Sequence, residues 1–324
     1  MPASKCWPTQ RPGPARAAAT VLVVGHGLIG APLRCRLLAS GYRTVCVTRG
    51  SQGQPGCRAH DLAGQAGRSA LRTMLCELCP TCVVLTHGPS DVTWIEQHEE
   101  QAAAVHCGVA EIMGASGVPT VLVSTDNVFE GTRGGYRPCD QVQPANAYGR
   151  VKAQAEELVL SGGSGLVLRV SLVYGWAGPT HRATFAERCL RAAFESGPLF
   201  APTDQVFTPV QVHDVVAVVN ALCRLPRPLY GVRHLAGPRE LSRYEFARIA
   251  YQLAGANPEL VRPCLRRDTQ WASRPQFSSL ECADFTGIPE LNGWHPMAPH
   301  DGLRTMLAER PRGRGERRIT WPGN

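Results

Sequence analysis

The sequence predicts an α/β protein with a doubly wound parallel sheet, and three observations carry this prediction. Short apolar, β-branched runs alternate with longer stretches of helical spacing. A glycine-rich turn directly follows the first apolar run, and from Trp176 onward prolines interrupt the regular pattern. Strands that alternate with helices favour a parallel sheet covered on both faces, and the break in the pattern indicates a smaller C-terminal lobe.

The first βαβ unit is the clearest part of the pattern. A strand is predicted at residues 19–24, a helix runs from the glycine turn to a stop at Gly41, and a second strand is predicted at 44–48. Further strands are predicted at residues 82–85, 120–124 and 166–171, and a helix at 243–253. Together these elements predict a Rossmann-type sheet.

The distribution of charge argues against a nucleic-acid partner. The formal net charge is +8, but residues 1–19 carry +3 and residues 304–324 carry +4, which leaves about +1 for the body of the protein. A body so close to neutral lacks the basic face that binding to a phosphate backbone requires.

Composition also bears on the compartment. The chain has 13 cysteines, an odd number, and residues 1–19 contain no apolar stretch of the kind that a secretory signal needs. The sequence contains no run of about 18 apolar residues, which is the length that a membrane-spanning helix needs. We therefore expect a reduced, cytoplasmic protein with no membrane segment. The assembly state stays open, a homodimer included.

The glycine turn has the pattern of a dinucleotide-binding site. In Gly25-His26-Gly27-Leu28-Ile29-Gly30, Gly25 permits the tight turn and Gly27 lets the backbone approach a pyrophosphate. Gly30 allows the helix to pack on the strand, and Leu28 and Ile29 lie at the helix N-terminus, where phosphate binds. The alternative is an ordinary glycine turn.

The end of the second strand favours NADP over NAD. An NAD site would place an acidic residue here, whereas the chain has Thr48-Arg49-Gly50. The Arg49 guanidinium suits a 2′-phosphate, although a solvated surface charge is the alternative. Asp61 and Leu62, after the next linker, are weaker candidates for contacts with the adenine.

Tyr148 and Lys152 form the most informative pair. At a spacing of i and i+4 on a helix, the two side chains share one face. The chain has 32 arginines and only two lysines, so a lysine here points to a specific need for an ammonium group. An ammonium can hydrogen-bond both ribose hydroxyls and lower the pKa of a nearby phenol, which then donates a proton. An exposed helix with an incidental Tyr and Lys is the alternative.

Ser124, Thr125 and Asp126 follow an apolar strand, at the edge where doubly wound sheets bind ligands. Thr125 and Asp126 are therefore candidate catalytic residues, with Thr125 orienting a substrate carbonyl. A helix cap or a turn is the other interpretation.

These segments together resemble the extended short-chain dehydrogenase/reductase family, with greatest similarity to the dTDP-4-dehydrorhamnose reductases. The resemblance rests on residues 25–30, 124–131 and 148–152, and extends from about Thr20 to Leu307. It implies a catalytic set of Thr125, Tyr148 and Lys152. It also implies transfer of a hydride from the nicotinamide cofactor, NADP or alternatively NAD, to a keto carbon of a nucleotide-linked sugar.

Three departures from the family pattern stand out. The first glycine sits one residue later than in the family's GxxGxxG. Residues 86–90 replace the family's Asn-Ala-Ala, so the contacts of Thr86 near the nicotinamide are expected to differ. Asn127, a candidate substrate-binding residue, stands where related dehydratases carry a Glu base, and an amide cannot abstract a proton. Dehydration is therefore disfavoured.

The predicted organisation follows from these motifs. We expect a disordered leader at 1–19, an NADP-binding Rossmann domain at 20–175 to which 207–235 returns, a substrate-binding lobe at 176–206 and 236–307, and a basic disordered tail at 308–324. In the lobe, Arg182 and Arg274 are candidates for contact with a diphosphate, because guanidinium groups suit phosphate oxygens. Surface or interdomain charges are the alternative.

Two other patterns are given structural interpretations. Cys76, Cys79 and Cys82 form CxxCxxC, but no fourth ligand is nearby and the run enters an expected buried strand, so no metal site is predicted. Asp214, after His213, is interpreted as a helix cap. Two other functions remain open: a nucleotide-sugar epimerase, and a non-catalytic NADP-binding regulatory subunit like that of methionine adenosyltransferase, which also resembles this family.

Overall fold

The computed structural model describes residues 19–50, 55–178, 181–285 and 287–310. Its centre is a seven-stranded sheet in the order β11-β6-β5-β4-β1-β2-β3, in which every neighbouring pair is parallel. The strands are β1 (Thr20–Val24), β2 (Arg43–Thr48), β3 (Cys57–Ala59), β4 (Cys82–Leu85), β5 (Thr120–Thr125), β6 (Gly165–Val170) and β11 (Gly231–Leu235). The predicted fold class is confirmed. The expected leader and tail fall almost entirely outside the described residues.

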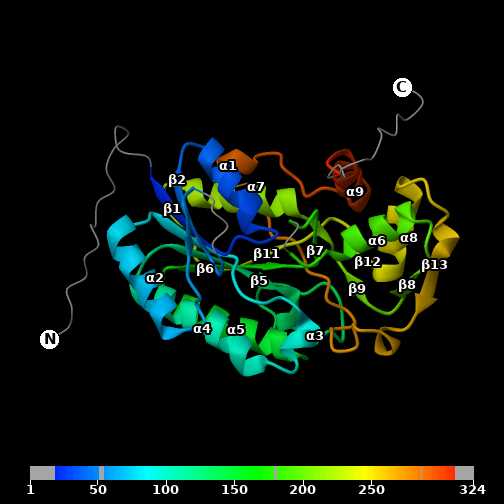
Figure 1. Ribbon diagram of the computed structural model, residues 1–324, viewed down its shortest axis with the longest axis horizontal. Helices are drawn as coiled ribbons and strands as arrows, with labels where there is room; N and C mark the ends of the chain where they lie inside the picture. The colour runs from blue at the N-terminus through cyan, green and yellow to red at the C-terminus, as the bar shows by residue number, and fades with distance from the viewer. Residues whose placement is uncertain (1–18, 51–54, 179–180, 286, 311–324) are drawn as a thin grey trace.

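Helices cover both faces of the sheet (Figure 1). One face packs against α1 (Gly30–Ala39) and α7 (Val212–Arg224). The other packs against α2 (Gln65–Leu78), α4 (Glu99–Ser116) and α5 (Ala147–Ser161). Side chains of the strands alternate between these two cores: in β1, Val21 and Val23 face α1, whereas Leu22 and Val24 face α2. Such strands are buried on both sides, which explains their continuous apolar runs.

The sheet order contains a switch point between β1 and β4. From β1 the chain winds outward through β2 and β3, and it then returns to add β4 and β5 on the other side. The connections to the two sides leave a crevice at the carboxyl ends of the strands, where doubly wound sheets bind ligands. The glycine turn after β1 lies at this point.

A smaller layer of helices and short strands packs beside the carboxyl ends of the sheet (Figure 1). Its core joins α6 (Phe185–Phe194), α8 (Arg243–Leu253) and α9 (Pro299–Ala308). Short strands complete it in pairs: β7 (Val173–Tyr174) with β10 (Val210–Gln211), β8 (Leu199–Pro202) with β13 (Val261–Cys264), and β9 (Val206–Phe207) with β12 (Leu241–Ser242). The predicted helix at 243–253 matches α8, which begins with a capping box between Ser242 and Glu245.

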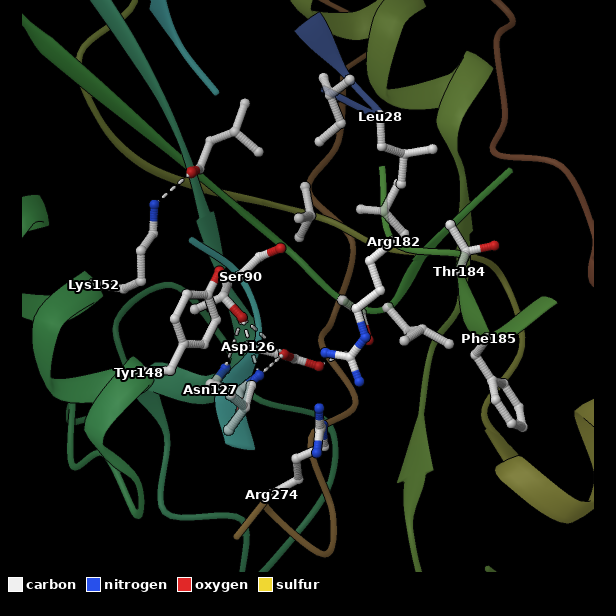
Figure 2. Close-up of a pocket in the computed structure, with 18 of the residues that line it drawn as sticks. Leu28, Ser90, Asp126, Asn127, Tyr148, Lys152, Arg182, Thr184, Phe185 and Arg274 are labelled. Carbon is white, nitrogen blue, oxygen red and sulfur yellow. Dashed lines mark hydrogen bonds between the residues drawn. The ribbon is translucent and has the colours of Figure 1, made fainter. Parts of the chain in front are cut away.

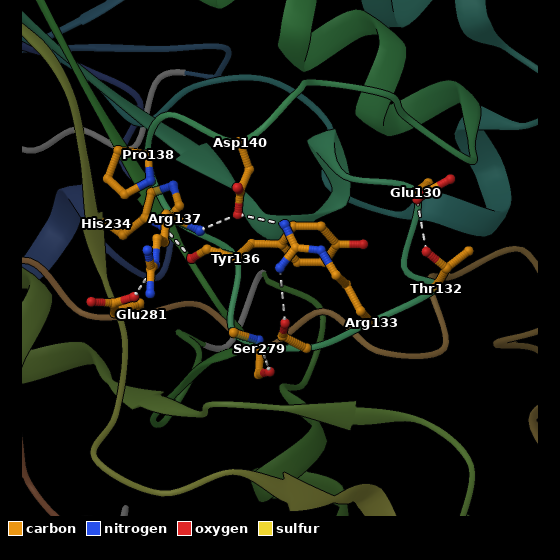
Figure 3. Close-up of polar contacts among 12 residues, drawn as sticks. Glu130, Thr132, Arg133, Tyr136, Arg137, Pro138, Asp140, His234, Ser279 and Glu281 are labelled. Carbon is orange, nitrogen blue, oxygen red and sulfur yellow. Dashed lines mark hydrogen bonds and ion pairs between the residues drawn. The ribbon is translucent and has the colours of Figure 1, made fainter.

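The segment between the end of β5 and α5 packs against β11 and against residues 279–281 (Figure 3). The Tyr136 carbonyl accepts hydrogen bonds from the backbone of Glu281 and from the His234 ring. Ion pairs join Arg137 to Glu281 at 2.9 Å and Arg133 to Asp140 at 2.7 Å. These contacts hold the segment that carries the residues after β5 into position beside the sheet.

The prediction for Asp214 is wrong. The cap of α7 is Gln211, whose side chain accepts a hydrogen bond from the backbone of His213. Asp214 lies one turn further in and instead accepts from the backbone of Met297, at 2.9 Å. The helix therefore begins three residues earlier than expected, because the short strand β10 ends at Gln211.

Within the described part of the chain, we find no helix with the length and apolar character that crossing a bilayer requires.

Candidate active site

A cavity of about 420 Å³ opens at the carboxyl ends of β1, β4, β5 and β6, between the sheet and the smaller layer. This volume is in the range of small-molecule sites. The predicted residues that line it are Gly27, Leu28, Ile29, Thr86, Thr125, Asp126, Asn127, Tyr148, Lys152, Arg182 and Arg274. Residues that lie more than 240 positions apart in the chain thus meet at one cavity.

The glycine turn fits the pyrophosphate of a dinucleotide. Gly25 has φ +107°, and a Cβ there would lie 2.7 Å from the Thr86 backbone. At Gly27, by contrast, an added Cβ would meet only the His181 ring, at 3.8 Å, so there is room above its backbone. The N-terminus of α1 has no side-chain cap. Its N–H groups and dipole are therefore suited to an anion.

The residues at the end of β2 lie beyond the cavity. Thr48 is buried and its hydroxyl donates to the Gly50 carbonyl, whereas Arg49 is exposed. Asp61 closes a turn by accepting from the Ala63 backbone, and Leu62 packs into the core beneath α2. None of these four residues lines the cavity, so their predicted contacts with the cofactor stay predictions.

Tyr148 and Lys152 come from the first two turns of α5, which begins at the Asn146 cap. Both side chains reach the cavity, but they diverge within it (Figure 2). The Lys152 ammonium donates to the Val123 carbonyl of β5 at 2.8 Å. The phenol instead shares a hydrogen bond with Thr125. Tyr148 and Lys152 therefore lie on one face of α5, as predicted. The nearer partner of the phenol is Thr125.

The expected effect on the pKa of Tyr148 is wrong for this structure. Burial raises the pKa of Tyr148 above its usual value, the charge of Asp126 raises it further, and the hydrogen bond with Thr125 opposes the rise only in part. Burial also lowers the pKa of Lys152 to about 8, while Glu156 favours its charged form. Desolvation outweighs any effect of the ammonium on the phenol, because Lys152 is directed at Val123.

Asp126 is the centre of a buried hydrogen-bond network. Its carboxylate accepts from Ser171 at 3.1 Å, from Ser278 at 2.8 Å and from Asn127 at 2.8 Å. Burial raises the pKa of Asp126, and these hydrogen bonds counteract the rise. Asn127 also accepts from the Asn146 amide at 2.9 Å. The network ties the end of β5 to the cap of α5 and to the smaller layer.

Arg182 and Arg274 lie on the side of the cavity formed by the smaller layer, with their guanidinium groups directed toward one another (Figure 2). Arg182 pairs with Asp91 at 2.5 Å. Arg274 donates to the Gln270 carbonyl at 3.1 Å, and burial lowers its pKa to about 10, with Arg182 contributing. The two predicted residues therefore meet in space although 92 positions separate them in the sequence.

Two further arginines of the cavity were missed by the sequence analysis. Arg243 is only 4% exposed, and one of its terminal nitrogens has no partner among the described residues. The same is true of the Nε of Arg188. Burial lowers the pKa of Arg243, and the charges of Arg274 and Arg188 lower it further. No local sequence signal marks them, since both lie on helices of ordinary composition.

Two buried histidines were missed as well. His87 donates from Nε2 to the Val105 carbonyl at 3.3 Å, and His106 likewise to the Pro89 carbonyl at 2.9 Å. Burial lowers the pKa of both rings, to about 3 for His87, and Lys152 contributes. Because a carbonyl only accepts, each neutral ring keeps an unprotonated Nδ1, and neither Nδ1 has a partner among the described residues. The sequence signal for this side of the cavity was the departure from the family pattern at residues 86–90.

A family model described as the RmlD substrate binding domain matches residues 19–309. The chain belongs to this family. The match confirms the resemblance to sugar-nucleotide reductases of the extended short-chain dehydrogenase/reductase type.

Individual relatives agree with membership of the RmlD family. The dTDP-4-dehydrorhamnose reductase of Mycolicibacterium smegmatis is 27% identical over 288 residues, which cover 85% of this chain and 82% of the relative. A crystal structure of dTDP-4-dehydrorhamnose reductase from Bacillus anthracis in complex with NADP has a TM-score of 0.76 and 23% identity, with coverage of 90% of this chain and 100% of that one. These reductases agree with the predicted class, an NAD(P)-dependent oxidoreductase.

One relative of the chain has a different kind of name. Methionine adenosyltransferase 2 subunit beta of Bos taurus is 26% identical over 197 residues, which cover 58% of this chain and 59% of the relative.

Proposed function

We propose that this chain is an NADPH-dependent reductase that transfers a hydride to a keto group of a nucleotide-linked sugar, a dTDP-4-keto-6-deoxy sugar being the expected substrate. Tyr148 is the proton donor. The observation that carries the proposal is the convergence of Thr125, Tyr148 and Lys152 on the cavity that also contains the glycine turn. A site for a dinucleotide and a partly buried proton donor thus face the same space.

Each residue of the site has a separate role in the proposed reaction. NADPH, when bound, supplies the hydride. The Tyr148 hydroxyl donates its proton to the oxygen of the reduced carbonyl, and a high pKa keeps this phenol protonated at neutral pH. Thr125, which shares a hydrogen bond with the phenol, orients the same oxygen. Lys152 holds positive charge close to the site and is placed to bind ribose hydroxyls with its remaining N–H groups.

The arginines support a substrate that carries phosphate. Four arginines line the cavity: Arg182, Arg188, Arg243 and Arg274. Among the residues that the structure describes, only Arg182 of these four has an ion pair, with Asp91. Buried guanidinium groups that repel one another and keep unpartnered N–H groups are stabilised when an anion enters. A diphosphate would offer oxygens to several of them at once.

Experiments on the same purified protein also test two alternative functions. An epimerase uses this fold and the same Tyr-Lys pair, but keeps its cofactor bound between turnovers, whereas a reductase releases NADP on purification. A non-catalytic subunit is favoured by the bovine relative, and would bind NADPH without turning it over.

The first experiment measures NADPH oxidation by the purified chain with a panel of nucleotide-linked 4-ketosugars. We expect turnover, and we expect Tyr148→Phe to reduce kcat by at least about 100-fold, because a positioned proton donor contributes about that much or more. Tyr230→Phe is the matched control, since that phenol is exposed and lies outside the cavity.

Binding separates the outcomes. Fluorescence titration should give Tyr148→Phe the same Kd for NADPH as the unmodified chain. Tight binding of NADPH with no turnover on any sugar would contradict the reductase proposal and favour the subunit. Equal turnover in the two tyrosine variants would contradict the role of Tyr148.

A further inference from the structure

Behind the glycine turn, three side chains with metal-binding atoms converge. The Sγ atoms of Cys46 and Cys57 and a ring nitrogen of His26 all lie within 4.8 Å of one another. The convergence has a structural cause. Cys46 and Cys57 are register partners on the parallel strands β2 and β3, so their side chains leave the same face of the sheet. His26 reaches them from the turn that follows β1, the neighbouring strand on the other side of β2.

We propose that His26, Cys46 and Cys57 bind one thiophilic metal ion of the zinc class. Zinc bonds of about 2.3 Å to sulfur and about 2.0 Å to nitrogen place neighbouring ligand atoms about 3.5 to 3.8 Å apart, so a side-chain shift of about 1 Å would gather these three. The fourth ligand is an oxygen, either of the Gly25 carbonyl, which lies 3.6 Å from Cys46 Sγ, or of a water molecule. The site is separate from the cavity of the proposed reaction, which none of the three ligands lines.

The charges and protonation of the three groups are compatible with this. Burial lowers the pKa of His26, with contributions from Arg34 and His181, which favours the neutral ring that offers a lone pair to a metal. Burial raises the pKa of the Cys46 thiol to about 12, and Cys57 adds to the rise. A divalent cation binds both cysteines as thiolates, which forms two metal–sulfur bonds and releases the thiol protons to solvent. Two thiolates then balance the charge of the ion.

The surroundings allow an ion to enter and favour the thiolates. Cys46 is fully buried, whereas Cys57 and His26 are partly exposed. An ion from solvent therefore reaches the site past these two side chains. The nearby Arg34 favours the thiolate form of Cys46, although its charge also opposes a cation. Its terminal nitrogen is held at the Pro55 carbonyl. The CxxCxxC run shows no such convergence: Cys76 and Cys79 are exposed, and Cys82 is buried in β4.

The test uses Co²⁺ as the probe on the full chain, reduced with a phosphine and kept free of oxygen. We expect one Co²⁺ per chain with thiolate-to-cobalt charge-transfer absorption, and displacement by Zn²⁺. His26→Gln and Cys57→Ser should each weaken Co²⁺ binding by at least about 100-fold, since loss of an outer-shell partner alone costs about 10- to 100-fold. The matched control is the double variant Cys76→Ser with Cys79→Ser, which removes two exposed thiols and should bind Co²⁺ unchanged.

Circular dichroism of each variant shows whether it is folded. If Cys57→Ser does not fold, His26→Gln still tests the proposal, because it changes a partly exposed side chain. The proposal is overturned if the unmodified chain gives no charge-transfer absorption, or if the control variant loses it. It is also overturned if the chain binds no Co²⁺ when reduced and peptide mapping without reductant finds a disulfide between Cys46 and Cys57. None of these outcomes depends on reductase activity.

Discussion

At the scale of single residues, burial decides what the polar groups of the cavity can do. Tyr148 keeps its proton because desolvation and the charge of Asp126 oppose ionisation. The opposite holds for Lys152, whose ammonium is destabilised by the same desolvation. A donor that holds its proton until a carbonyl oxygen gains negative charge suits reduction, because the proton is then transferred only as the hydride arrives.

Arg49 carries the prediction of cofactor preference. Arg49→Ala should weaken NADPH binding by about 10- to 100-fold, since a hydrogen bond to a charged group contributes about 1.5–3 kcal/mol, and should leave NADH binding unchanged. Fluorescence titration with both cofactors measures this. Arg43→Ala is the control, because Arg43 is also exposed but lies at the far end of β2. Equal losses for NADPH and NADH would contradict a contact with the 2′-phosphate.

At the scale of elements, a buried ion pair joins α5 to β6 behind Tyr148 and Lys152. Arg169 donates to both carboxylate oxygens of Glu156, at 2.7 to 3.1 Å, and both side chains are no more than 4% exposed. The Ser124 hydroxyl donates to the same carboxylate, so β5 is included. The pair lies one turn beyond Lys152 on α5 and helps to fix this helix against the sheet.

Removing one partner of this pair should be costly. Glu156→Ala leaves a buried guanidinium without a counter-charge, and we expect a loss of about 3–5 kcal/mol in the free energy of unfolding. Glu99→Ala removes an exposed partner of Arg150 and should cost less than about 1 kcal/mol. Denaturant titrations of the two variants compare them. Similar losses in both would show that the buried pair contributes no more than a surface one.

At the scale of the whole molecule, the cavity wall and the core contain histidines that folding keeps neutral. Burial lowers the pKa of His87 to about 3 and that of His234 to about 4. In the unfolded chain these rings take up protons near pH 6.5, so the unfolded state binds more protons below that value. Stability should therefore fall as the pH falls below about 6.5. Asp214, whose pKa burial raises to about 6, offsets part of this between pH 6 and 4.

A single variant isolates one histidine. Between pH 7 and pH 5, His87 should account for a loss of about 2 kcal/mol in the free energy of unfolding. In His87→Gln, whose amide can still donate to the Val105 carbonyl, the fall over this range should be smaller by that amount. Denaturant titrations at both pH values measure the difference. An unchanged pH dependence would mean that His87 is protonated in the folded protein.

The sequence by itself determined the parallel sheet, because each strand had to be buried on both faces and so appeared as an apolar run between amphipathic helices. It also identified the glycine turn and the pair Tyr148 and Lys152, because their function depends on spacings within one turn or one helix. These local patterns survive folding unchanged.

Only the tertiary structure decided which distant groups meet. Arg188 and Arg243 join Arg274 at one cavity because three separate elements converge there, and His26, Cys46 and Cys57 meet because the register of β2 and β3 aligns two thiols. The pKa of Tyr148 also follows from burial and from Asp126, not from its spacing to Lys152. Desolvation and Coulomb interactions depend on positions in space, and no pattern of neighbours in the chain encodes them.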